Sequence, residues 1–217
     1  MHALAGALLF ATAASLAPGA PAPVIGEDAV WSPPAGFQES MRAACKGKSG
    51  DALGACFAAE MKNAGAPPAA LAFTRRTDNQ GYLRLFVGGG RVGVACATYP
   101  FRANENDVCF LVNGSPPMLD VDDPRNQDRP ALALNVGYQA LQKKYPNLAI
   151  FPGDRGGAPA IQGQPRREGG QEFIVEYFLQ DGCHACARIA QMRLAFTFDT
   201  AGKFEGSRLR TIRVLKR

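Results

Sequence analysis

The segment VGVACATYPFRANENDVCFLV, residues 92–112, decides the expected fold. Both of its ends alternate residues in the pattern of β-strands, and a polar loop separates them. Pairing Cys96 with Cys109 puts both cysteines on one face of a hairpin. The same register sets Val94 opposite Leu111, so that apolar side chains also meet. The segment therefore predicts an antiparallel hairpin with a Cys96–Cys109 disulfide.

Alternating apolar residues indicate further strands on both sides of this hairpin. One precedes it at residues 83–87, and three follow it at residues 172–179, 192–199 and 203–214. A Thr-Ala-Gly turn at residues 200–202 joins the last two. Because most of these strands follow one another through short turns, we expect a mostly antiparallel β-sheet.

Helical periodicity precedes the strands. Phe37, Met41 and Cys45 recur every four residues, and a second stripe with this spacing covers residues 53–61 after a Gly-Lys-Ser-Gly break. In one continuous helix Cys45 and Cys56 would stand about 16 Å apart, too far for a disulfide. The break therefore predicts a helical hairpin and makes a Cys45–Cys56 disulfide feasible.

The remaining elements complete an α+β fold. A middle helix is expected over residues 130–145, because apolar residues follow a helical spacing there and Pro146 ends the pattern. Glycine and proline are frequent at residues 153–171, which predicts a mobile loop. Residues 23–217 are thus expected to form a single α+β domain, with the helical hairpin and the middle helix on one face of the sheet.

The N-terminal residues 1–22 have the composition of a secretory signal peptide. An apolar run at residues 3–10 is followed by small residues and prolines, and no Asp, Glu, Lys or Arg precedes Glu27. The n-region carries no lysine or arginine, and cleavage after Ala13 or after Gly19 suits the small-residue rule. Six cysteines fit an oxidising compartment, so we expect a periplasmic or secreted protein.

Charge and hydropathy limit the partners that we expect. The chain carries 24 basic and 19 acidic residues, a net charge of +5, with five basic residues in the last ten. No aromatic residues lie among them to stack on bases, so these charges are interpreted as protecting an edge strand, and no nucleic-acid partner is expected. No apolar run after the leader reaches the roughly 18 residues of a membrane span.

The cluster most like a catalytic motif is Cys183-His-Ala-Cys186. In thiol-disulfide oxidoreductases such a motif follows a strand and opens a helix, which lowers the pKa of the first thiol. A thioredoxin-like fold needs several strands and helices after the motif, and residues 187–217 leave little room for them. A structural Cys183–Cys186 disulfide is therefore favoured, with an envelope thiol-disulfide oxidoreductase as the alternative.

Other catalytic arrangements find little support. His184 is the only histidine after the leader, so histidine-dependent catalysis would have to use it, and no Gly-x-Ser-x-Gly elbow accompanies it. No second cysteine pair has zinc-ligand spacing, and the acidic stretch at residues 120–128 lacks the glycine and glutamate of a calcium loop. We therefore predict no catalytic residue, metal site or cofactor, and a binding protein is favoured over an enzyme.

The loop between the two strands of the hairpin is the candidate recognition site, because binding residues concentrate in loops on a rigid sheet. The alternative is that Arg102 pairs with Glu105 while asparagines cap the turn. The predicted function is a binding or inhibitor-type module that acts through surface loops on a protein or small ligand of the cell envelope. The candidate binding residues are Tyr99, Arg102, Asn104, Glu105, Asn106 and His184.

Overall fold

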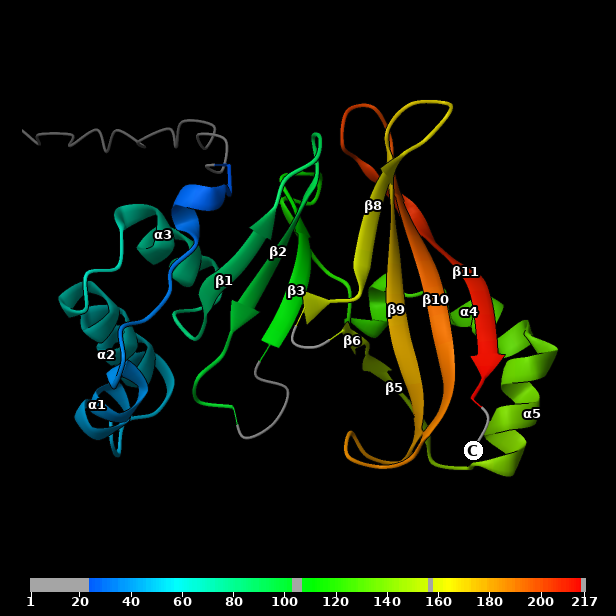
Figure 1. The fold of residues 1–217 in the computed structure, drawn as a ribbon, viewed down its shortest axis with the longest axis horizontal. Helices are drawn as coiled ribbons and strands as arrows, with labels where there is room; N and C mark the ends of the chain where they lie inside the picture. Colours follow the sequence, from blue (N-terminus) through cyan, green and yellow to red (C-terminus); the bar gives the residue numbers. More distant parts are fainter. Residues whose placement is uncertain (1–23, 103–106, 156–157, 216–217) are drawn as a thin grey trace, which may run out of the picture.

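In the computed structural model, which describes residues 24–102, 107–155 and 158–215, helices and two β-sheets form successive layers (Figure 1). Three helices cover one side of the first sheet, and the second sheet lies on its other side. Two further helices pack against the second sheet. The α+β class and the mostly antiparallel pairing expected from the sequence are confirmed.

The helical hairpin is formed by α1 (Phe37–Ala44) and α2 (Gly50–Asn63), preceded by a short 3-10 turn, η1 (Glu27–Ala29). The stripe of side chains predicted by the four-residue spacing is buried between them. The break between the helices lets Cys45 and Cys56 form a disulfide with a Cα–Cα distance of 5.8 Å. Both the hairpin and this disulfide are confirmed.

A third helix, α3 (Pro68–Arg76), was not expected from the sequence. Pro68 suits the first helical turn, where its missing N–H is not needed. Ala70 and Phe73 lie one turn apart on the same side of the helix and are both buried. Burial of this face decides in favour of the helix.

The first sheet has the strand order β1-β2-β3-β4 and is antiparallel throughout. Cys96 lies opposite Cys109 and Val94 opposite Leu111, as the sequence predicts, and the two cysteines form a disulfide. The strands are β1 (Tyr82–Val87), β2 (Gly93–Thr98), β3 (Asp107–Val112) and β4 (Met118–Asp120).

Strand β2 is buried on both faces. The sequence predicts a single sheet, whereas the structure has two larger sheets, and the second covers one face of β2. Ala95 and Ala97 face the helices, in a cluster with Phe73. Val94 and Cys96 face the second sheet. Small residues on one face and larger ones on the other allow helices and a second sheet to pack on opposite sides of the first.

The second sheet has the order β11-β10-β9-β5, and β8 pairs with the half of β9 that β5 leaves free. The three long strands expected in the C-terminal third are confirmed, including the turn at residues 200–202. Two very short strands, β6 (Asp154–Arg155) and β7 (Ala158–Pro159), pair separately. The strands of the sheet are β5 (Leu148–Pro152), β8 (Ile161–Pro165), β9 (Gln171–Asp181), β10 (Arg188–Phe198) and β11 (Phe204–Val214).

The segment expected to be a mobile loop, about residues 153–171, therefore contains strand structure. Its longest strand, β8, has the sequence Ile-Gln-Gly-Gln-Pro, with a single β-branched residue. Such a composition does not indicate a strand by itself. The pairing with β9 is a tertiary interaction that local composition does not reveal.

The middle helix is divided into α4 (Arg129–Leu134) and α5 (Val136–Lys144). Asn135 has an extended backbone, and its side-chain oxygen accepts a hydrogen bond from the Tyr138 N–H at 3.0 Å, which starts the second helix. A 3-10 turn, η2 (Pro124–Asn126), precedes them. None of the helices in the described residues is long and apolar enough to cross a membrane.

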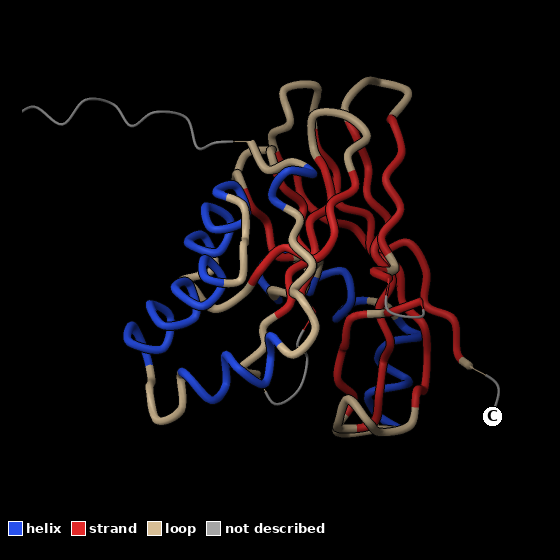
Figure 2. The backbone as a smooth tube through the Cα atoms, turned by 60° about the vertical axis from the view of Figure 1, so that its left-hand side comes forward, coloured by secondary structure: helices blue, strands red, loops and turns tan. Residues whose placement is uncertain are grey.

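One hydrophobic core joins the two sheets and the helices α4 and α5. Figure 2 shows the strands of both sheets side by side, with the first sheet between the N-terminal helices and the second sheet. Tyr177 is fully buried, and its hydroxyl donates a hydrogen bond to the Val121 carbonyl at 2.6 Å. Phe198 packs against Phe173 at 5.8 Å and against Phe204 at 5.3 Å between ring centroids.

Candidate functional site

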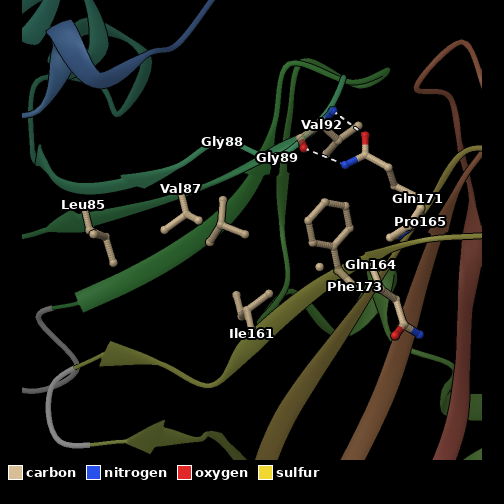
Figure 3. Close-up of a pocket in the computed structure, with 12 residues that line it drawn as sticks. Leu85, Val87, Gly88, Gly89, Val92, Ile161, Gln164, Pro165, Gln171 and Phe173 are labelled. Carbon is tan, nitrogen blue, oxygen red and sulfur yellow. Dashed lines mark hydrogen bonds between the residues drawn. The ribbon is translucent and has the colours of Figure 1, made fainter.

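A groove of about 260 Å³ lies between the two sheets, where β1 and β2 face β8 and β9 (Figure 3). The first sheet contributes Leu85, Val87, Gly88, Gly89, Val92 and Val94. The second contributes Ile161, Gly163, Gln164, Pro165, Gln171 and Phe173. Side chains from segments far apart in the sequence thus surround one apolar space.

Gln171 holds the two sheets together at one end of the groove. The Val92 N–H donates to Gln171 Oε1 at 2.7 Å, and Gln171 Nε2 donates to the Val92 carbonyl at 3.0 Å (Figure 3). The side-chain amide therefore satisfies both backbone groups of Val92, as a neighbouring strand would. This pair of bonds fixes the separation of the sheets at this end.

Phe173 forms part of the wall of the groove and lies opposite Gly163 in the pairing of β8 with β9. A Cβ atom at Gly163 would come within 2.9 Å of the Phe173 ring. The ring also packs edge-on against Phe198 in the core. Glycine at position 163 therefore lets the ring lie against β8, where it lines the groove.

The chemistry of the groove is that of a binding site. None of the twelve residues that line it carries an acidic, basic or thiol side chain. The amides of the two glutamines are already bonded within the protein, that of Gln171 to the Val92 backbone and that of Gln164 to Glu172 Oε2 at 2.8 Å. The remaining residues supply aliphatic, aromatic or glycine surface. Such a surface removes apolar groups from water but offers no nucleophile, acid or base.

The loop predicted for recognition is only partly described. Tyr99 is buried, and the Arg102 guanidinium lies over its ring at 3.8 Å from the centroid. Burial raises the pKa of Tyr99, and the positive charge of Arg102 acts in the opposite direction. Both residues line a small cavity of about 150 Å³ beside α2. The candidate residues Asn104, Glu105 and Asn106 lie outside the described residues.

The sixth candidate residue, His184, belongs to the other sheet. It is exposed in the connection between β9 and β10, and its ring contacts Phe151 of β5 edge-on at 5.3 Å. Within the described part of the chain, no contact joins His184 to Tyr99 or Arg102. The structure therefore does not gather the candidate residues into one site.

The Cys183–Cys186 pair forms a disulfide in the same connection, with a Cα–Cα distance of 5.0 Å. All six cysteines are therefore paired as the sequence predicts. The residues after Cys186 lead into β10, which starts at Arg188. No helix thus begins at this motif to lower the pKa of the Cys183 thiol.

We expect a redox titration of the Cys183–Cys186 pair to give a potential below about −300 mV, the range of structural disulfides. The purified protein should also fail to reduce insulin. A potential between about −120 and −270 mV, together with insulin reduction that Cys183→Ser abolishes, would instead establish a thiol-disulfide oxidoreductase.

The groove was missed in the sequence because its residues come from both sheets. Gly163, Gln164 and Pro165, which line it, lie within the segment expected to be a mobile loop. The two cysteines indicate the register of the hairpin. No comparable sequence feature indicates that β8 lies near β1. The described residues also hold no group of three or more His, Cys, Asp or Glu side chains suited to a metal ion.

Comparison of the chain with protein-family models, with curated proteins and with solved structures finds no match. The fold and the groove therefore define the protein only by its class, a disulfide-containing α+β protein with two packed antiparallel sheets.

Proposed function

We propose that this chain is a binding protein of the periplasm or the extracellular space, which takes an apolar ligand in the groove between its sheets. The observation that carries the proposal is the composition of the groove, an apolar surface from both sheets without an ionisable side chain. Ligand sites are commonly concave and apolar, with a few polar groups that fix orientation. The lining of the groove supplies the apolar part of such a site.

Two further features support an exported binding protein. Three disulfides form and persist in oxidising compartments, and the leader-like residues 1–22 agree with export. The groove also lacks groups for acid–base or nucleophilic catalysis, which favours binding over an enzymatic role. The surface loop with Tyr99 and Arg102 stays a separate candidate for a protein contact.

Binding of an apolar ligand in the groove can be tested with the Val87→Arg variant and the neutral fluorescent probe N-phenylnaphthylamine. Val87 lines the groove and is 51% exposed, so arginine is accommodated without disturbing the core. A guanidinium group at the apolar wall should weaken binding of the probe about tenfold, because polar surface replaces apolar contact. Fluorescence titration gives the Kd, and thermal unfolding should give an unchanged Tm.

Val214→Arg is the matched control. Val214 is also an exposed valine of an edge strand, 60% exposed, but it lies at the end of β11 and does not line the groove. Its replacement should leave the Kd for the probe unchanged. Equal Kd values for Val87→Arg and the unchanged protein, or no binding of the probe at all, would contradict the proposal.

A further inference from the structure

Strand β8 has one paired edge and one open edge. On one side it pairs with β9 over its whole length, from Ile161 opposite Val175 to Pro165 opposite Gln171. No other strand pairs with it among the described residues. Figure 3 shows β8 along the groove, with Ile161 pointing into the space below β1.

The hydrogen-bond alternation tells which backbone groups face this open edge. The Glu176 N–H donates to the Ala160 carbonyl at 2.9 Å, and the Arg166 N–H donates to the Gly170 carbonyl at 3.2 Å. The Ala160 carbonyl and the Arg166 N–H, on either side of β8, thus point toward the β9 chain. Because the direction alternates along an antiparallel strand, Ile161 and Gly163 direct theirs away from β9.

Pro165 agrees with this assignment, since a proline has no N–H and is tolerated where no ladder bond is required. None of the hydrogen bonds found in the described residues uses the outward N–H or carbonyl groups of Ile161 or Gly163. Gly163 is also exposed and has no side chain to keep another backbone away. The edge therefore presents free donors and acceptors that an added strand can pair with.

The same residues stand at the groove. Ile161 and Gly163 line it together with Phe173 and Val92, so the free backbone edge and the apolar surface are contiguous. A small apolar molecule would use the surface but leave the backbone edge unpaired. An extended peptide uses both, because its main chain pairs with the edge while alternate side chains point into the groove.

We propose that the groove binds an extended peptide with alternating apolar residues, which adds to the second sheet as a strand beside β8. The inference rests on the proposed binding function and names its class of ligand. The backbone of Gly163 supplies hydrogen bonds to the peptide, and the groove of about 260 Å³ takes an apolar side chain. Because β8 is short and ends at Pro165, the recognised segment is also short.

The test uses three acetylated and amidated peptides of eight residues, alternating valine with serine between single terminal lysines. The first is unmodified, the second is N-methylated on the backbone of every valine, and the third on that of every serine. In an extended strand, valine and serine direct their backbone N–H groups to opposite sides. Only one of the two modified peptides therefore loses its bonds to β8.

We expect the unmodified peptide to bind, one N-methylated peptide to bind about tenfold more weakly, and the other to bind within about twofold of the unmodified one. Isothermal titration calorimetry measures the affinities of the three peptides. Amide hydrogen exchange should also show the Gly163 N–H protected when the unmodified peptide is bound. The Val87→Arg substitution should weaken binding of the unmodified peptide, whereas Val214→Arg should leave its affinity unchanged.

Each other result overturns the inference in a different way. Equal affinities for both modified peptides would mean that side chains alone are recognised. Binding of N-phenylnaphthylamine without binding of any peptide would refute strand addition and leave the proposed function intact, whereas binding of neither would refute both. A concentration-dependent dimer that protects the Gly163 N–H without peptide would assign the edge to a second copy of the chain.

Discussion

Replacement of Phe198 by alanine is expected to lower the free energy of unfolding by about 3–5 kcal/mol. Phe198 is 1% exposed and lies in the core cluster that both sheets share, with ring contacts to Phe173 and Phe204. The close-packed surroundings cannot collapse fully into the space that the ring leaves, because buried side chains of both sheets pack in the same cluster. The free-energy cost of this cavity adds to the transfer free energy that is lost with the buried ring.

Urea unfolding followed by far-ultraviolet circular dichroism measures this loss. The matched control is Phe151→Ala, since Phe151 is only half-buried on β5 and contacts the exposed His184. The control should lose clearly less stability than Phe198→Ala. If Phe198→Ala instead produced two separate transitions, with one at the unchanged midpoint, the sheets would be independent and the single domain expected over residues 23–217 would be wrong.

Removal of the Cys45–Cys56 disulfide by a double alanine substitution is expected to cost about 3 kcal/mol, because the bond closes a loop with a sequence separation of 11. Helix α1 has eight residues and is too short to be stable alone. Without the bond, its packing against α2 has to supply the whole cost of ordering it. Hydrogen exchange in α1 should therefore rise more than exchange in β9 or β10.

The corresponding control removes Cys183–Cys186, which has a sequence separation of 3 and lies in an exposed connection. Its loss should cost less than that of Cys45–Cys56, because a shorter loop restrains the unfolded chain less. The same urea unfolding measures both variants. An equal or larger loss of stability on removal of Cys183–Cys186 would contradict this expectation. It would show that the disulfide stabilises the second sheet at least as much as Cys45–Cys56 stabilises the helical hairpin.

Much of the fold could be predicted because its periodicities are local. The cysteines at positions 96 and 109 constrain the register of β2 and β3, and the structure has that register. The helical break between Cys45 and Cys56 likewise follows from the spacing of apolar residues and from the reach of a disulfide. Where a short-range pattern and a covalent restraint agree, the sequence determines the local structure closely.

The other elements depend on tertiary contacts. Helix α3 is decided by burial of Ala70 and Phe73, and β8 by pairing with β9, although its Gln-Gly-Gln-Pro sequence is typical of a loop. The division of the strands into two sheets depends on what covers each face of β2. None of these contacts has a periodic signal within a short window of sequence.

The candidate site was harder to predict than the fold. Polar density drew attention to Tyr99 and Arg102, whereas the groove is formed by aliphatic residues and glycines that read as ordinary strand and turn positions. Its position follows from how the two sheets meet. The binding experiments described above test the groove.

The two hydrogen bonds between Gln171 and Val92 also bear on the order of folding, since they join residues 79 positions apart in the chain. Contacts of such long sequence separation form late, because the intervening chain loses entropy before they stabilise it. The first sheet can pair its strands locally while Val92 and Val94 still face water. The groove therefore requires β8 and β9 to lie beside β1 and β2, because residues from both halves of the chain line it.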